Sequence, residues 1–310
     1  MFIGVLTRLN KVIITGATGF IGTALSKRLL DLGVEVIALS RSLDVPESLC
    51  ANEKYQHVCM DVNDISKLET MPINISNVDA FIHLAWGGTS GEGRRDINLQ
   101  NKNIEMTMNC FAFAKKIQCG KFVFAGTIQE DEIDYAKDHP TLINPSLIYG
   151  SAKKYAHYLC EFSPRDDMEV CTLKITNIFG PGENTPRFIN TTIRKLLKKE
   201  PLQFSASTQN YDFIYLDDAV DAIIGVAEKG IDNKEYVIGS GGAKPLKEFI
   251  YEMIALLDSS AVPNFSNIEG LSLDKSFYDI TPLVEDIGWK PKKSFKEGIE
   301  LTADWIKNNL

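Results

Sequence analysis

The stretch KVIITGATGFIG, residues 11–22, constrains the fold of this chain more than any other segment. Residues 11–16 form a short apolar run typical of a buried strand, and glycines stand at positions 16, 19 and 22. A helical pattern follows to Leu32 and stops at Gly33. A glycine-rich turn between strand and helix lets the backbone approach a pyrophosphate, which sits at the helix N-terminus. We therefore predict a dinucleotide site at Gly16, Gly19 and Gly22.

The alternation of strand and helix continues over the first 175 residues. Further apolar runs predict strands at 34–40, 56–61, 78–86, 121–126 and 169–175. Helical stretches lie between them at about 94–118 and 150–162. This alternation is typical of a parallel sheet that helices cover on both faces.

The rhythm changes after Ile175, where the chain becomes loop-rich. A helix reaches about Lys199, and a strand at 211–218 with the helix behind it is expected to return to the main domain. We predict an α/β fold: a Rossmann-type doubly wound parallel sheet with a smaller, mostly helical C-terminal substrate lobe. The dinucleotide-binding domain is assigned to 1–175, with 208–234 returning to it, and the lobe to 176–207 and 235–310.

Composition excludes several classes of partner. The net charge of −8 gives no global basic field for nucleic acid or an anionic membrane. The six cysteines show no CxxC spacing and the four histidines are scattered, so we expect reduced thiols and no metal site. The opening MFIGVLTRLNK has too short an apolar run for a signal peptide, and no later run reaches membrane-spanning length. We expect a cytoplasmic protein.

Ser40 and Arg41 end the second expected strand, and they bear on the choice of cofactor. An NAD site usually has an acidic residue there for the ribose hydroxyls, whereas a nearby arginine suits the 2′-phosphate of NADP. Glu35 begins the strand and is too early to serve. Arg41 could also be a solvated loop charge. NADP is therefore the expected cofactor, with NAD as the alternative.

Several ordered blocks resemble one family across nearly the whole chain. This is the extended short-chain dehydrogenase/reductase family, within the group of nucleotide-sugar epimerases, dehydratases and reductases. The blocks are TGATGFIG (15–22), MDVND (60–64), HLAW (83–86), NIEMTMN (103–109), NIFGPG (177–182) and YDFIYLDD (211–218).

The resemblance implies a set of cofactor-binding residues. The glycine motif adds Thr18, Phe20 and Ile21 to its three glycines, and Asp61 with Val62 corresponds to the acid that contacts adenine. The remaining positions that the resemblance places along the cofactor are Leu84, Ala85, Trp86, Asn103, Tyr149 and Lys153.

The family's catalytic group is a Tyr-x-x-x-Lys pair with a Ser or Thr at the end of the fifth strand. Tyr149, Lys153 and Thr127 stand at these positions. A phenol with a pKa near ~10 must be eased toward neutral pH to exchange protons, and a nearby ammonium favours phenolate. The threonine hydroxyl can orient a substrate carbonyl. The family's dehydratases place Asp-Glu directly after the threonine, whereas Ile128 and Gln129 stand here, so dehydration is disfavoured.

The later blocks imply contacts to the substrate. Asn177 corresponds to an asparagine that touches phosphates, or else stabilises its loop, and Arg187 is a diphosphate ligand or a surface charge. Tyr211 stands where the family often has an arginine that binds the diphosphate, which leaves the substrate open. Gly87 is also placed at the substrate. Glu130 and Asp131 are either a solvated loop or a substrate contact.

These observations predict NADP-dependent reduction of a keto group, at C4, on a nucleotide-activated deoxysugar. A nucleotide-sugar 4-epimerase that retains NAD would use the same three catalytic residues. A non-catalytic NADP-sensing regulator is the alternative from another class. The expected partners are a nucleotide-diphosphate sugar and a second copy of the chain, since relatives commonly pair the helices at 94–118 and 150–162 across a two-fold axis.

Overall fold

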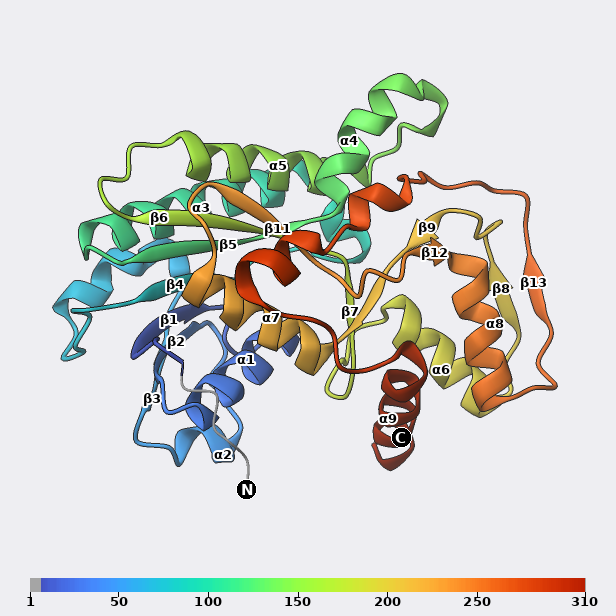
Figure 1. Ribbon diagram of the computed structural model, residues 1–310, viewed down its shortest axis with the longest axis horizontal. Helices are drawn as coiled ribbons and strands as arrows, with labels where there is room; N and C mark the ends of the chain where they lie inside the picture. Colours follow the sequence, from blue (N-terminus) through green and yellow to red (C-terminus); the bar gives the residue numbers. More distant parts are fainter. Residues whose placement is uncertain (1–6, 310) are drawn as a thin grey trace.

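The computed structural model describes residues 7–309, which are built around a seven-stranded parallel sheet (Figure 1). The strand order is β11-β6-β5-β4-β1-β2-β3. The bounds are β1 Lys11–Thr15, β2 Glu35–Ser40, β3 Tyr55–Cys59, β4 Ala80–His83, β5 Lys121–Thr127, β6 Glu169–Ile175 and β11 Lys234–Ile238. The chain winds outward from β1 in both directions, and in such sheets ligands bind at the carboxyl ends of the strands where the winding reverses. The predicted doubly wound fold is confirmed.

Helices form a layer on each face of this sheet. On one face α1 (Phe20–Asp31) packs against α7 (Leu216–Lys229), and on the other α3 (Ile97–Lys116) packs against α5 (Leu147–Phe162) (Figure 1). Asp96 starts α3 because its carboxylate accepts hydrogen bonds from the free backbone N–H groups of Asn98 and Leu99. The shorter elements here are α2 Glu47–Cys50, η1 Val62–Thr70, η2 Gly91–Arg94, α4 Gln129–Asp138 and η3 Pro140–Leu142.

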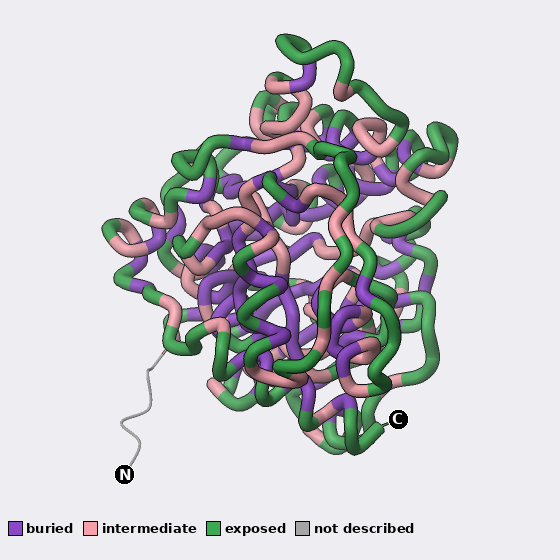
Figure 2. Tube along the Cα trace, turned by 90° about the vertical axis from the view of Figure 1, so that its right-hand side faces the viewer, coloured by how far each residue is buried: buried purple, intermediate pink, exposed green. Residues whose placement is uncertain are grey.

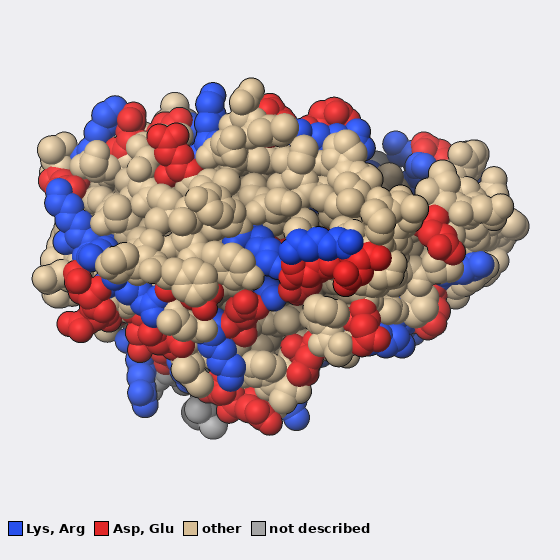
Figure 3. Space-filling model, turned by 90° about the horizontal axis from the view of Figure 1, so that it is seen from above, with Lys and Arg blue, Asp and Glu red and all other residues tan. Residues whose placement is uncertain are grey.

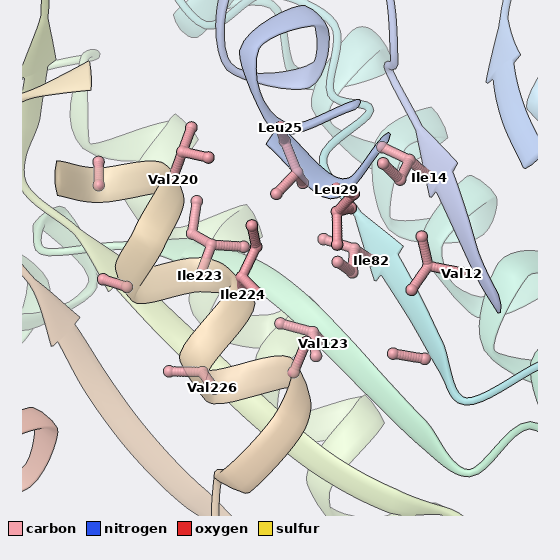
Figure 4. Close-up of a cluster of buried hydrophobic side chains, with 14 of the residues drawn as sticks. Val12, Ile14, Leu25, Leu29, Ile82, Val123, Val220, Ile223, Ile224 and Val226 are labelled. Carbon is pink, nitrogen blue, oxygen red and sulfur yellow. The ribbon is translucent and has the colours of Figure 1, made fainter. Parts of the chain in front are cut away.

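The strands are buried because they are almost continuous apolar runs, as helices on both faces require. All of β1 is buried. On the α1–α7 face, Leu25 and Leu29 of α1 join Ile14 of β1 and Ile223 of α7 in one cluster (Figure 4). Fully burying a side chain of this size stabilises the fold by about 1.5–3 kcal/mol. This packing fixes α1 on the sheet and, with it, the glycine turn that precedes the helix.

A second body of structure follows β6 and has a core of its own. Its helices are α6 (Phe188–Lys198), α8 (Leu246–Leu257) and α9 (Phe295–Asn308), which bury Ile193, Met253 and Ile306 among other residues. Figure 2 shows buried stretches inside the molecule and exposed ones along its outer turns. Short two-stranded sheets connect it: β7 Asn177–Phe179 with β10 Phe213–Tyr215, β8 Leu202–Phe204 with β13 Pro263–Phe265, and β9 Asn210–Tyr211 with β12 Lys244–Pro245. Two short helical segments, η4 Lys275–Tyr278 and η5 Leu283–Ile287, complete the chain.

The structure differs from the sequence-based expectation in three places. The strand expected at 211–218 divides into β9 and β10, neither of which joins the large sheet, and α7 already begins at Leu216. Asp217 and Asp218 in the first turn of α7 interact favourably with the helix dipole. Strand β11 pairs with β6, and Leu283 and Ile287 pack in the α1–α7 core, although 235–310 was assigned to the lobe.

Residues 1–6, on which the expectation about a signal peptide partly rests, lie outside the described part of the chain. Within residues 7–309, no helix combines the length and the apolar character needed to cross a membrane.

Candidate active site

A cavity of about 1300 Å³ opens at the carboxyl ends of the central strands, between the sheet and the lobe. The elements that line it are the β1–α1 turn, the ends of β2, β4 and β5, the start of α5, and β7 and β9 of the lobe. The residues that the sequence assigned to cofactor, substrate or catalysis lie on its wall, except Glu130 and Asp131, for which a substrate contact was one of two interpretations. The structure therefore brings together residues that are far apart in the chain.

The glycine turn leaves a cradle that side chains would fill. Gly16 has φ of +71°, and a Cβ there would lie 3.0 Å from the backbone nitrogen of Ala85. A Cβ on Gly22 would lie 2.2 Å from the carbonyl oxygen of Gly16. Helix α1 begins at Phe20 without a capping side chain or an acidic residue in its first turn. Its first N–H groups and positive dipole end therefore suit a dinucleotide's pyrophosphate, and Thr18 and Ile21 line the cavity at this turn.

The end of β2 carries the residues expected to select the cofactor. The hydroxyl of Ser40 is already engaged, with Nε2 of His57 at 2.8 Å and the carbonyl of Ser42 at 3.1 Å. Arg41 is exposed at the cavity rim, and its guanidinium forms no ion pair or hydrogen bond with any described residue. Asp61 uses Oδ1 to accept from the backbone and side-chain nitrogens of Asn63, at 2.9 and 2.8 Å. Arg41 is therefore available to a phosphate.

The segment after β4 forms the floor of the cavity, with Leu84 and Ala85 leading into Trp86 and Gly87. Asn103 of α3 holds this segment, because its amide accepts from the N–H of Gly87 and donates to the carbonyl of Gly87, both at 2.8 Å. The indole of Trp86 donates to Gln100 at 2.8 Å. Both amide groups of Asn103 are thus used on the protein backbone, so its contact in this structure is to the floor itself.

Thr127, Tyr149 and Lys153 lie together at one end of this floor. Thr127 ends β5, while Tyr149 and Lys153 stand one turn apart on α5, and all three are buried. The ring of Trp86 meets that of Tyr149 edge-on, with centroids 6.4 Å apart. The Tyr149 phenol, the Thr127 hydroxyl and the Trp86 ring therefore line the same part of the cavity.

Burial raises the pKa of Tyr149, and the charges of Arg94 and Arg187 act in the opposite direction. The guanidinium carbon of Arg94 lies 4.6 Å from the centroid of the Tyr149 ring. Arg94 is thus the cation that most favours the phenolate here. The Tyr-x-x-x-Lys motif contains no such arginine. In the sequence, Arg94 is marked only by its place in a glycine-rich loop.

Lys153 lies against aromatic rings rather than in water. Its Nζ is 3.9 Å from the centroid of Trp86 and donates to the carbonyl of Ala125 at 2.6 Å. Burial lowers the pKa of Lys153 from its ordinary 10.5 to about 7. The ammonium expected from the sequence is therefore poised to lose its proton near neutral pH.

The lobe side of the cavity carries the expected substrate residues. The side-chain nitrogen of Asn177 donates to the carbonyl of Asp212 at 3.1 Å, which ties β7 to the segment before β10. Arg187 precedes α6 and pairs with Glu183 at 3.4 Å while remaining half-exposed. Tyr211, on β9, is oriented toward the cavity, where burial raises its pKa. Arg187 pairs through its Nε atom, which leaves the rest of its guanidinium group for a ligand.

Glu130 and Asp131 belong to helix α4 and not to a solvated loop, and neither of them lines the cavity. Glu130 is 1 % exposed, and it accepts from the N–H of Thr127 at 2.8 Å and from Nδ1 of His157 at 2.9 Å. Asp131 pairs with Lys174 at 2.8 Å. The partners of these two carboxylates come from α5 and β6, which are distant in the sequence, so the neighbouring residues could not indicate them. The cavity residues to which sequence reasoning gave no role include Arg94, Gln129, Glu132, Glu183 and Tyr278.

Fold and cavity together define a nicotinamide-dependent enzyme class, in which a parallel sheet presents a glycine turn beside a Tyr–Lys pair. The chain belongs to the NAD dependent epimerase/dehydratase family, whose model matches residues 12–239.

Among curated relatives, the chain is 26 % identical over 300 residues to CDP-abequose synthase of Salmonella typhimurium, which covers 93 % of this chain and 96 % of that protein. It is 25 % identical over 312 residues to dTDP-4-dehydro-6-deoxyglucose reductase of Escherichia coli, with 94 % and 96 % covered.

Solved structures show the same fold over almost the whole chain. UDP-glucose 4-epimerase of Thermotoga maritima, solved with UDP-glucose, superposes with a TM-score of 0.78 at 21 % identity, covering 96 % of this chain and 99 % of that one. UDP-glucose 4-epimerase of Thermus thermophilus, solved with NAD, gives 0.74 at 20 % identity, with 97 % and 100 % covered.

Proposed function

We propose that this enzyme reduces a keto group, at C4, on a nucleotide-activated deoxysugar and draws its hydride from NADPH. The observation that carries the proposal is the end of β5. Thr127 lies beside Tyr149 on the cavity wall, while Ile128, directly after Thr127, is an apolar residue buried in a small core with Leu273 and Tyr278. Without a carboxyl at this position, the site supports hydride and proton transfer better than elimination of water.

The chain's own residues supply the proton chemistry. When bound, the nicotinamide supplies a hydride to the carbonyl carbon. Tyr149 donates the proton that the carbonyl oxygen needs, and Thr127 hydrogen-bonds this oxygen and orients it. Arg94 stabilises the phenolate left on Tyr149, and Lys153 assists when protonated.

The glycine turn and Arg41 support NADP as the cofactor. The α1 N-terminus would hold the pyrophosphate, and the guanidinium of Arg41, which pairs with none of residues 7–309, would hold a 2′-phosphate. A charge-assisted contact of this kind contributes about 1.5–3 kcal/mol, or roughly ten- to a hundredfold in affinity.

A nucleotide-sugar 4-epimerase with retained NAD is the second candidate. It is favoured by the two 4-epimerases that share the fold over almost the whole chain. Thr127, Tyr149 and Lys153 would serve that reaction equally well, so net consumption of cofactor separates the two.

The decisive experiment incubates a trace of enzyme with NADPH and a panel of 4-keto-6-deoxyhexoses linked to dTDP, CDP, UDP or GDP. We expect one NADPH to be oxidised for each sugar reduced. An epimerase would instead interconvert UDP-hexoses with no net change in NADPH.

Cofactor choice is tested by titrating NADPH and NADH into the wild type and Arg41→Ala. We expect NADPH to bind more tightly to the wild type, and Arg41→Ala to narrow the difference by roughly ten- to a hundredfold. Arg95→Ala is the matched control, because Arg95 is exposed, pairs with Glu92 and lies off the cavity wall. Equal affinities in the wild type, or NAD that survives purification, would favour the epimerase.

We also propose a homodimer formed through α3 and α5. Tyr155 and Phe162 of α5 are 57 % and 73 % exposed, although both are large apolar side chains. Figure 3 looks onto the side of the molecule where α5 lies and shows a broad area without charged side chains. An exposed apolar surface of this kind suits a two-fold interface.

A further inference from the structure

The cavity wall carries a carboxyl group that hydride transfer does not use. Glu132 lies on α4 one turn after Gln129, so both side chains point to the same side of the helix, into the cavity. Oε2 of Glu132 accepts from Nε2 of Gln129 at 3.1 Å, whereas Oε1 has no partner within residues 7–309. Glu132 is half-buried, and partial desolvation raises the pKa of its carboxyl. One oxygen is therefore held and the other is available to a ligand.

A chain of contacts connects this carboxyl to the reacting phenol. The side-chain oxygen of Gln129 accepts from Nη2 of Arg94, whose guanidinium lies over the ring of Tyr149. Arginine can only donate and an ionised carboxylate can only accept, so Gln129 must turn its oxygen to Arg94 and its nitrogen to Glu132. The network thus fixes Glu132 relative to Tyr149.

The position of Tyr149 decides which part of the substrate Glu132 meets. A proton donor must lie within hydrogen-bond reach of the carbonyl oxygen, so the keto carbon sits at Tyr149. Because Gln129 and Arg94 link Glu132 to Tyr149, we assign this carboxyl to the sugar ring rather than to the nucleotide. A carboxylate accepts hydrogen bonds, and the donors on a sugar ring are hydroxyls. Of the carbons beside C4, C5 is bonded to the ring oxygen, which leaves C3 to carry a hydroxyl.

We propose that Glu132, held by Gln129 and Arg94, accepts a hydrogen bond from the C3 hydroxyl of the keto sugar and thereby selects 3-hydroxy sugars over their 3-deoxy counterparts. The proposal rests on the function given above, because a C4 carbonyl at Tyr149 is what directs C3 to Glu132. A carboxylate that the bound sugar shields from water but gives no donor is left unpaired, so the deoxy sugar should bind less well.

The test measures binding, which does not depend on turnover. Matched pairs of 6-deoxyhexoses and 3,6-dideoxyhexoses, each linked to UDP, dTDP and CDP, are titrated calorimetrically into the enzyme loaded with oxidised cofactor. We expect the wild type to prefer the 3-hydroxy member by roughly ten- to a hundredfold, the range for a hydrogen bond to a charged group. Glu132→Ala should reduce this ratio to about threefold or less, and Glu132→Gln, which keeps a neutral acceptor, should lie between.

Asp138→Ala is the control, because it removes an exposed carboxylate from the same helix away from the cavity. The kcat/KM for the corresponding keto sugars gives a second readout. A preference that survives in Glu132→Ala, or a wild type that binds both sugars of a pair equally, would overturn the proposal. Selective binding without NADPH oxidation would uphold Glu132's role while rejecting the reductase function.

Discussion

At the scale of single residues, the burial of Lys153 lowers the free energy of unfolding of the folded protein when the amine is protonated. Its amine is buried against Trp86 and has a pKa of about 7, compared with 10.5 in an exposed position. Between these pH values the unfolded chain holds the proton more tightly than the folded protein. The free energy of unfolding should therefore rise as pH rises from 7 toward 10.5, and it should be lowest where both states are protonated.

Comparison with Lys153→Met isolates this effect. In chemical denaturation without cofactor, we expect the wild type to gain roughly 2–3 kcal/mol relative to Lys153→Met between pH 6 and pH 9. The variant should also be the more stable protein at the acidic end, although its turnover should fall. Parallel stability curves for the two proteins would show that Lys153 is not destabilised by burial.

At the scale of elements, α4 ties the end of β5 to α5. Glu130 accepts from the N–H of Thr127 and from His157, and its carboxylate is almost wholly buried. Glu130→Ala would leave both donors without this partner. We expect the free energy of unfolding to fall by about 2–4 kcal/mol, as measured by urea denaturation. Asp138→Ala, at the exposed end of α4, should change it by less than about 0.5 kcal/mol. Equal effects of the two substitutions would contradict this role for Glu130.

Helix α4 also shows why part of the structure was beyond sequence reasoning. The strands of the sheet were predictable because each is an apolar run that needs no partner to be recognised. The segment QEDEID is acidic and resembles a solvated loop. Its second residue, Glu130, is nevertheless buried, because its carboxylate pairs with His157 of helix α5, 27 positions further along the chain. The strand predicted at 211–218 was wrong for a different reason. Its apolar run continues into helix α7 without a break, so the sequence marks the start of the helix only by the acidic residues of its first turn.

The same contrast applies to the candidate site. The glycine turn, Thr127, Tyr149 and Lys153 form local motifs, and the structure places them around one cavity. Arg94, Gln129 and Glu132 have no fixed spacing from these motifs, and only the packing of α4 brings them together. Local motifs thus indicated the proton-transfer residues, whereas these other residues of the cavity wall could be found only from the fold.

At the scale of the whole molecule, the apolar surface of α5 predicts self-association. Tyr155→Glu combined with Phe162→Glu should convert a dimer into a monomer, because like charges would meet across a two-fold axis without water. Light scattering at micromolar concentration measures the mass. Val262→Glu, which alters an 85 % exposed side chain of the lobe, should leave the dimer intact. A monomeric wild type would contradict the proposed interface.

The proposed reaction depends most on Tyr149, which donates the proton in the reduction of the ketone. The direct measurement is turnover of Tyr149→Phe with NADPH and the best keto sugar from the panel, alongside the affinity of the same variant for NADPH. We expect turnover to fall by roughly 10²-fold or more, the usual scale for a positioned acid, while NADPH binds almost as tightly as to the wild type. Near-normal turnover in Tyr149→Phe would contradict the assigned chemistry.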